Sequence, residues 1–350
     1  MATIILTGGG TAGHCTPNLA LIPYLKNDFD KIIYVGSDNG IEKSILSNTN
    51  IPYYSVSCAK LDRSKKLTNL KIPFKVAKGI IQAGKILDKE KPDVIFSKGG
   101  YVSVPLVIAA AKRKIPVISH ESDYSVGLAN KISARFSAKV LTTFPETAKT
   151  LKNGEYVGSP IRKSMYSVSK EDAYKFFGFS GNKPVLLVTG GSQGANAINK
   201  AVRSALPTLL SKFDIIHACG KNNLLDGKIP KGYFQTEYIN KIENAFAVAS
   251  VCVSRAGSNT LFELMSLKIP TVLIPLPQGA SRGDQILNAK YFQKLGLAYL
   301  LNQDALSEQS LIFAINSVYN NRANLTKNFE KHPIKDASRQ ISRIIADYLN

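Results

Sequence analysis

One stretch of the chain, residues 251–289, combines residue types that bind a nucleotide and a sugar. An apolar strand at 251–253 runs into a turn of Gly and Ser, a helix at about 260–267 and a second apolar strand at 271–274. The first backbone N–H groups of a helix have no partner within that helix, and together with the helix dipole they attract phosphate. The stretch therefore predicts an anion site where this turn meets its helix.

Polar side chains of the same stretch match the other groups of a nucleotide sugar. Ser258 or Asn259 suits the N-cap position of the helix. Glu263, about one turn later, offers the two acceptor oxygens that a ribose diol needs. Gln285 and Asn288 lie three residues apart, so they share a helix face on which their amides can bind sugar hydroxyls. A plain strand–helix unit with solvated polar residues is the alternative that this stretch alone leaves open.

Length and composition limit what can position these residues. A chain of 350 residues exceeds the usual size of one core, so two domains are expected. The net charge of +20 favours an anionic partner such as a nucleic acid, an acidic membrane surface or a phosphorylated ligand, unless it reflects a general bias toward Lys. The four cysteines are scattered, which predicts reduced thiols in a cytosolic protein. Neither a signal peptide nor a membrane-spanning helix is predicted.

Strand and helix patterns alternate along most of the chain. The chain opens with a buried strand at residues 3–6, a glycine turn and a helix expected to start near Pro17. Further strands are expected at 32–35, 93–96, 117–119 and 140–142. Such alternation predicts an α/β fold with doubly wound parallel sheets, whose ligands bind beyond the carboxyl ends of the strands.

A Thr-Gly-Gly turn occurs twice in the same setting. It follows an apolar strand and precedes a helix at residues 7–9 and again at 189–191. This internal repeat predicts two similar α/β domains. We expect residues 1–159, joined by a C-terminal helix within 335–350, to form the first domain and residues 160–334 to form the second.

Residues 60–91 are both basic and apolar, with ten Lys and Arg residues against three acidic ones. A segment of this kind suits docking on anionic lipid. A helix that faces the core and exposes its lysines is the alternative. The residues expected to contact a membrane are Lys65, Lys66, Leu67, Leu70, Lys71, Ile72, Phe74 and Lys75.

Seven motifs, in order across nearly the whole chain, resemble one enzyme family. They are GGGTAGHCTP, KGGYVSVP, HESDYSVGLANK, GSPIR, TGGSQGA, SRAGSNTLFEL and DQILNA. Together they resemble the MurG family, the bacterial undecaprenyldiphospho-muramoylpentapeptide N-acetylglucosaminyltransferases of glycosyltransferase family 28. The resemblance implies a GT-B fold, with two Rossmann-like doubly wound domains facing across a cleft.

The resemblance also implies an activity. It is the inverting, metal-independent transfer of N-acetylglucosamine from UDP-N-acetylglucosamine to the C4 hydroxyl of the muramyl sugar in lipid I. The product is lipid II, an intermediate of peptidoglycan synthesis. A peripheral location on the cytoplasmic face of the cell membrane follows, and no cofactor is expected.

Roles for single residues come with the resemblance, which places the acceptor on the first domain and the donor on the second. The residues implied to hold the acceptor diphosphate are Gly10, Gly13, Gly99, Gly100 and Tyr101. Those implied to surround the donor are Arg162 and Ser192 at its diphosphate, Ile239 at its uracil, Ser258, Asn259, Thr260, Leu261, Phe262 and Glu263 along one helix, and Thr11, Ala12, Gly13, Asp123, Gln285 and Asn288 near its sugar. Two positions depart from the family pattern: Ala12 stands where Gly is common, and Ser122-Asp123 where Gln-Asn is common.

The implied reaction needs a base for the acceptor hydroxyl and a means of holding charge on the departing UDP. His14 is the predicted base, because an imidazole titrates near neutral pH and this one follows the first glycine turn. A role limited to hydrogen bonding is the alternative for His14, and Glu121 and Asp123 are rival bases. Arg162 and the helix after the second Thr-Gly-Gly turn can hold the charge, so no metal is expected.

Three other functions compete with this prediction. An NAD-dependent oxidoreductase would use Gly8, Gly10, Gly13 and Asp38, but it leaves Glu263 without a role. A non-enzymatic binder of anionic lipid or nucleic acid would use the positive charge, yet no aromatic-rich basic strand indicates RNA binding, so no nucleic-acid partner is expected. A related GT-B enzyme with another lipid acceptor is the closest alternative.

Overall fold

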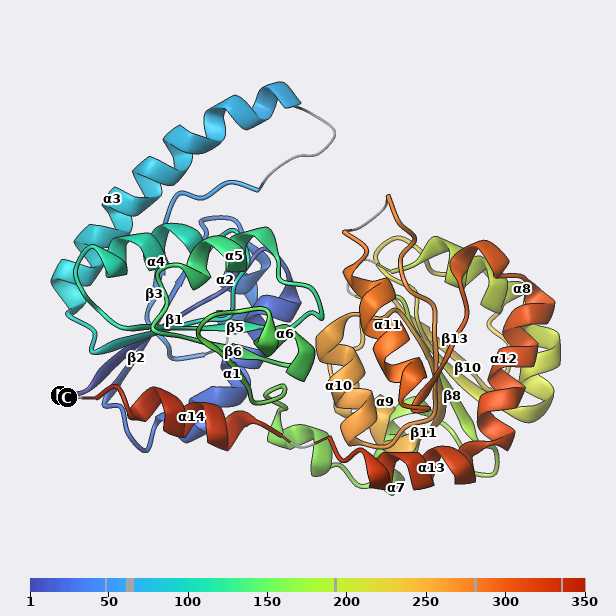
Figure 1. Cartoon of the computed structure of the whole chain (residues 1–350). Helices are drawn as coiled ribbons and strands as arrows, with labels where there is room; N and C mark the ends of the chain where they lie inside the picture. The colour runs from blue at the N-terminus through green and yellow to red at the C-terminus, as the bar shows by residue number, and fades with distance from the viewer. Residues whose placement is uncertain (48, 61–65, 192–193, 280–281, 335, 350) are drawn as a thin grey trace. The chain divides into compact units, whose positions relative to one another are not determined.

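The computed structural model describes residues 1–47, 49–60, 66–191, 194–279, 282–334 and 336–349, with the backbone alone for 66–68. The chain forms two compact units, of which unit 1 comprises Met1–Arg162 and Asp336–Asn350 and unit 2 comprises Lys163–Lys335. Each unit is a parallel sheet with helices on both faces (Figure 1). The predicted fold class, α/β with two doubly wound sheets, is confirmed.

Unit 1 is built on seven parallel strands in the order β3-β2-β1-β4-β5-β6-β7. The strands are β1 (Thr3–Thr7), β2 (Lys31–Gly36), β3 (Tyr53–Ser55), β4 (Val94–Ser97), β5 (Val117–Glu121), β6 (Lys139–Thr142) and β7 (Gly154–Tyr156). The helices are α1 (Ala12–Leu25), α2 (Ile41–Leu46), η1 (Lys66–Lys71), α3 (Ile72–Glu90), α4 (Val104–Ala111), α5 (Leu128–Ala134), α6 (Pro145–Lys149) and α14 (Ser338–Ala346). The strand order reverses between β1 and β4, the position at which doubly wound sheets bind ligands.

Alternating side chains of β1 build two cores, one on each face of the sheet. Ile4 and Leu6 pack with α1 and α14, whereas Ile5 packs with α3 and α4. In Figure 1, α14 lies along α1. Because helices cover both faces, the loops at the strand ends are where unit 1 can present chemistry.

The first helix starts earlier than predicted. Helix α1 begins at Ala12, and Pro17 lies inside it rather than at its first position. The proline ring offers no N–H to the turn before it, and within that turn the Thr16 hydroxyl donates to the Ala12 carbonyl at 3.1 Å. His14 therefore belongs to the first turn of a helix.

Unit 2 repeats the design with six parallel strands in the order β10-β9-β8-β11-β12-β13. They are β8 (Val185–Thr189), β9 (Asp214–Ala218), β10 (Tyr233–Thr236), β11 (Ala249–Ser254), β12 (Thr271–Leu273) and β13 (Ala298–Leu300). The helices are η2 (Lys163–Tyr166), α7 (Lys170–Phe177), α8 (Asn196–Lys212), α9 (Ile242–Val248), α10 (Ser258–Ser266), α11 (Asp284–Lys294), η3 (Gln303–Ala305), α12 (Glu308–Asn320) and α13 (Arg322–Lys331). Strand β8 lies in the centre, so the second Thr-Gly-Gly turn follows a fully buried strand, as the first one does.

Buried His217 makes the folded protein sensitive to acid. Its ring lies 2.9 Å from Asn199 Oδ1 and 2.8 Å from the Tyr233 hydroxyl, and burial lowers its pKa from 6.5 to about 3. Below pH 6.5 the unfolded chain therefore binds a proton that the folded chain does not bind. The free energy of unfolding consequently falls as the pH falls toward 3. We expect this histidine alone to cost about 2 kcal/mol between about pH 7 and about pH 5. Urea unfolding of the parent and of His217→Gln at both pH values checks this, and equal losses in the two proteins would contradict it.

Candidate active site

Two glycine turns of unit 1 touch at the point where the strand order reverses. A Cβ added to Gly100, whose φ is +81°, would lie 2.4 Å from the Gly9 carbonyl oxygen. Only glycine permits both this backbone conformation and this approach. The same Cβ would lie 3.5 Å from Cγ of His14, so the imidazole borders the second turn as well as its own. The structure thus brings together His14, Gly10 and Gly100, which the sequence places far apart.

His14 is half-buried in the first turn of α1, next to Thr11, Ala12 and Gly13. Its Nδ1 lies 2.8 Å from the Thr11 hydroxyl. When Nδ1–H donates to that hydroxyl, Nε2 carries the lone pair that can accept a proton. The helix start therefore holds His14 in a geometry that suits a base.

Glu42 is a residue of this site for which the sequence predicted no role. Although fully buried, it accepts hydrogen bonds through both oxygens: Oε1 from the Ser37 N–H at 3.0 Å and Oε2 from the Gly10 N–H at 3.1 Å. The first turn of α2 is thereby fixed to the first glycine turn. The sequence feature that could have pointed to Glu42 is its position as a carboxylate in the first turn of a helix that follows Gly40.

Lys98 directly precedes the second glycine turn, and its side chain is anchored at the end of β5. It is almost fully buried, with Nζ 2.8 Å from Nδ1 of His120 and hydrogen-bonded to the Ser122 hydroxyl. His120 Nε2–H donates to the Gly158 carbonyl at 2.9 Å. Burial lowers the pKa of Lys98 to about 8 and holds the pKa of His120 well below its usual value. Ser122, one of the two departures from the family pattern, therefore serves as an acceptor for Lys98.

Glu121, predicted as a rival base, organises the loop that follows β5. Its Oε1 accepts the Asp123 N–H at 2.9 Å, and its Oε2 accepts the Gly127 N–H and the Asn130 amide, each at 2.9 Å. Only 3% of its surface is exposed. This arrangement favours a positioning role for Glu121, which fixes the backbone that carries Asp123.

In unit 2, buried polar side chains fix the turn after β11. Arg255 donates to the carbonyls of Ile274 at 3.0 Å and Pro275 at 3.1 Å, and Asn288 donates to the Ala256 carbonyl at 3.1 Å. Asn288 is fully buried, so its amide positions this turn instead of facing sugar hydroxyls as predicted. No role for Arg255 was predicted.

Gln285 lies on the same helix, α11, as Asn288 but is only partly buried. Its Oε1 accepts the Leu276 N–H at 3.1 Å. The Nε2 group is then the part of this amide that can donate to a ligand. The structure thus brings Gln285 to the loop that follows β12.

Helix α10 starts one residue earlier than the predicted caps require. Gly257 is its N-cap, so Ser258, Asn259 and Thr260 are helical and offer backbone N–H groups in its first turn. Leu261 and Phe262 face the core, where Phe262 packs edge-to-face on Phe292 with centroids 5.3 Å apart. Glu263 is half-buried in the following turn. Ile239 is almost fully buried near β10.

Some predicted residues lie outside the described part of the chain. They are Ser192 in the second Thr-Gly-Gly turn and Lys65, together with the side chains of Lys66 and Leu67. Further along the chain, the 17-residue helix α8 begins after Ala195, an N-cap without a side-chain hydrogen bond. Its first N–H groups are suited to bind phosphate. Arg162 is the last residue before unit 2 in the chain.

Among the described residues, no group of three His, Cys, Asp or Glu side chains could hold a metal ion. Within those same residues, no helix is long and apolar enough to span a membrane.

Comparison with known proteins identifies relatives along the whole chain. The model of the glycosyltransferase family 28 N-terminal domain matches residues 4–142, and that of the family's C-terminal domain matches residues 185–341. A protein from Clostridium botulinum strain Hall is 47% identical over 99% of both chains. A protein from Clostridium perfringens strain 13 is 48% identical over 98% of this chain and 97% of the relative. Both relatives are called UDP-N-acetylglucosamine--N-acetylmuramyl-(pentapeptide) pyrophosphoryl-undecaprenol N-acetylglucosamine transferase. The crystal structure of Acinetobacter baumannii MurG shares the fold, with a TM-score of 0.74, 23% identity and 99% coverage of each chain.

Proposed function

The chain belongs to glycosyltransferase family 28, and on that premise we propose how its two units divide the work of N-acetylglucosamine transfer. It is a transferase that moves N-acetylglucosamine from UDP-N-acetylglucosamine to the muramyl sugar of lipid I, giving lipid II for peptidoglycan synthesis. The observation that carries this function is identity near 47% with such transferases over 99% of the chain. We assign the lipid-linked acceptor to unit 1 and the nucleotide sugar to unit 2.

The proposed acceptor site is the pair of glycine turns around His14. Gly10, Gly13, Gly99, Gly100 and Tyr101 surround the acceptor diphosphate, and the Gly10 N–H keeps its hydrogen bond to Glu42 instead of donating to the phosphate. The hydrogen bond from the Gly10 N–H to Glu42 supports this assignment, because it fixes the shape of the first turn before an acceptor arrives. Lys98 gives the second turn a comparable support.

In the proposed donor site, each part of UDP-N-acetylglucosamine meets a group of matching chemistry. Glu263 accepts from the two ribose hydroxyls, and the Ile239 backbone pairs with the uracil. Arg162, Ser192 and the first N–H groups of α8 hold the diphosphate. The amide Nε2 of Gln285 and the N-terminal turn of α1, from Thr11 to Gly13, contact the sugar, with Asp123 as a further candidate.

The proposed reaction is one displacement. His14 Nε2 removes the proton of the C4 hydroxyl as that oxygen attacks the anomeric carbon of N-acetylglucosamine from the face opposite UDP. The bond from that carbon to UDP breaks, and the electron pair leaves on the β-phosphate. Arg162 and the N-terminus of α8 stabilise this charge, so the step requires no metal. Because the attack comes from the face opposite UDP, the anomeric configuration is inverted.

An assay of substrate choice tests the function against the closest alternative. Purified protein is given UDP-N-acetylglucosamine with a lipid I analogue, and separately UDP-glucose or UDP-galactose with diacylglycerol. We expect transfer in the first mixture. Transfer only to diacylglycerol would identify a related enzyme with another lipid acceptor.

We further propose that unit 1 docks on the anionic cytoplasmic face of the membrane. Leu70, Phe74 and Ile81 are 70%, 78% and 64% exposed along η1 and α3. Large apolar side chains on a basic helix favour binding at the surface of a charged bilayer. Lys71, Ile72 and Lys75, which were also predicted to take part, line a cavity as well.

Replacing Leu70, Phe74 and Ile81 by Ser should release the protein from anionic vesicles. Burying one such side chain contributes about 2 kcal/mol, so loss of three should reduce binding at least about tenfold. Vesicle cosedimentation measures this, and activity on a short-chain, water-soluble acceptor should be retained. Phe313→Ser, which removes a phenylalanine 65% exposed in unit 2, is the control. Equal cosedimentation of the triple variant and the parent would place the docking surface elsewhere.

A further inference from the structure

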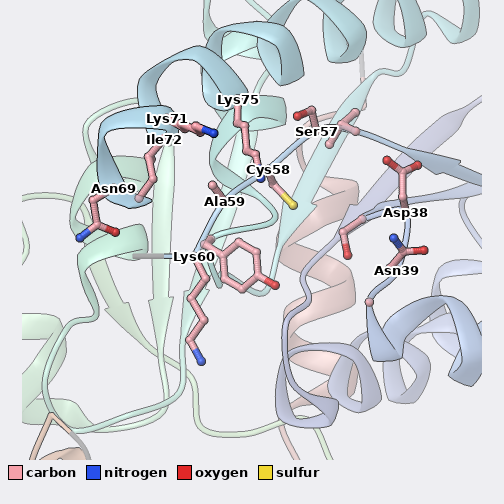
Figure 2. A pocket seen from close by; sticks show the side chains of 14 residues that line it. Asp38, Asn39, Ser57, Cys58, Ala59, Lys60, Asn69, Lys71, Ile72 and Lys75 are labelled. Carbon is pink, nitrogen blue, oxygen red and sulfur yellow. The ribbon is translucent and has the colours of Figure 1, made fainter. Parts of the chain in front are cut away.

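Unit 1 contains a cavity of about 730 Å³ that the proposed reaction does not use. It lies where β2 and β3 end and α3 begins (Figure 2). Lys60, Lys71 and Lys75 bring three positive charges to its wall, and Asp38 brings one negative charge. Figure 2 shows Lys75 extending toward Cys58 in the middle of the lining.

The cavity shares a wall with the first glycine turn. Tyr101 lines it, and a Cβ added to Gly10 would lie only 2.5 Å from the Tyr101 ring. Gly40 also lines it and precedes α2, whose Glu42 accepts the Gly10 N–H. A ligand held at the glycine turns can therefore reach into this cavity within unit 1.

The charges of the cavity favour an anion. The Asp38 carboxylate already accepts a hydrogen bond from the Ser55 hydroxyl. None of Lys60, Lys71 and Lys75 forms an ion pair with a described residue. The side chains of Lys60, Lys71 and Lys75 are exposed to solvent, so they can attract a carboxylate that enters the cavity.

The acceptor named in the relatives carries a peptide that begins next to the reacting atom and ends in a carboxylate. Muramic acid bears a lactyl ether on O3, beside the C4 hydroxyl, and its carboxyl group is the point at which a peptide attaches through its amino end. The peptide therefore leaves the sugar close to the base and retains a free C-terminal carboxylate. The polyprenyl chain at the other end of the acceptor is apolar and does not match charged walls.

We propose that this cavity binds the peptide of the acceptor and that Lys71 and Lys75 form ion pairs with its C-terminal carboxylate. The assignment rests on the proposed function, because it takes the acceptor to be a muramyl peptide. The volume of the cavity, about 730 Å³, falls within the usual range of pockets that bind small ligands. The cavity then selects acceptors by their peptide, whereas the glycine turns bind the diphosphate that all such acceptors share.

The test compares two acceptors with the double variant Lys71→Gln/Lys75→Gln. Both acceptors are short-chain, water-soluble muramyl diphosphates assayed without vesicles; one carries the full peptide with its free carboxylate and the other a single amidated residue. We expect the double variant to raise KM for the full-peptide acceptor about tenfold and to leave its kcat, the donor KM and the KM for the truncated acceptor unchanged. Lys78→Gln/Lys85→Gln removes the same charge from exposed positions of α3 outside the cavity and should change nothing.

Each other outcome overturns the proposal. An unchanged KM for the full-peptide acceptor would show that the cavity does not bind the peptide. An equal rise for both acceptors would indicate that the lysines attract the diphosphate, and an equal rise in the Lys78/Lys85 variant would indicate a general charge effect. Failure of the proposed function looks different, since the parent would then transfer N-acetylglucosamine to neither acceptor.

Discussion

His14→Ala is expected to lower kcat by about 100-fold or more, the usual scale for the loss of a general base. The expectation rests on the position of the imidazole, which lies at the contact of two glycine turns with Nδ1 next to the Thr11 hydroxyl. Donor affinity should change little, because His14 is assigned to the acceptor oxygen. The decline in rate at low pH should also disappear, since the group that must be deprotonated is gone.

His332→Ala is the matched control for this prediction. His332 is exposed in unit 2, so its loss removes an imidazole without touching either glycine turn. Steady-state rates across pH for both variants provide the measurement. A His14 variant with normal kcat and a raised acceptor KM would make His14 a binding group, and the base would then be sought at Asp123.

Glu263→Ala is expected to weaken UDP binding by about 2 kcal/mol, or about 30-fold in Kd. The ribose would lose a charged acceptor while its hydroxyls remain removed from water. UDP and UDP-N-acetylglucosamine should be affected equally, because they share the ribose. Calorimetric titration with UDP gives the value directly.

Glu171→Ala, at an exposed position of α7, controls for the loss of one negative charge in unit 2. Glu263→Gln should lie between the parent and the Ala variant, because one acceptor oxygen remains. Parent-like affinity in Glu263→Ala would remove Glu263 from the ribose site.

Local patterns in the sequence predicted the central strands β1, β4, β8 and β11 among others, but not β3, β7, β9, β10 or β13. Buried strands such as Thr3–Thr7 are largely apolar runs, and the glycine turns that follow them can be read directly from the sequence. The same patterns misplaced the start of one helix. Pro17 is a favoured first residue of a helix, yet α1 begins at Ala12 and contains Pro17.

Glu42 and Asn288 show why the supporting residues were harder to predict. Glu42 meets Gly10 across 32 residues of sequence, and the contact exists because β2 pairs with β1 and carries α2 to the turn. Asn288 shares a helix with Gln285, but its burial directs the amide to the Ala256 carbonyl. A side chain's type and spacing identify what it can bind, whereas its neighbours in the fold decide which partner it takes.

The most direct test of the central claim is to follow the transferred sugar. Labelled UDP-N-acetylglucosamine and a water-soluble lipid I analogue are incubated with the protein and a chelator, and the linkage formed is determined by NMR. We expect one N-acetylglucosamine joined in the β configuration to the C4 oxygen of the muramyl sugar for each UDP released. An α linkage, or UDP release without labelled acceptor, would contradict it.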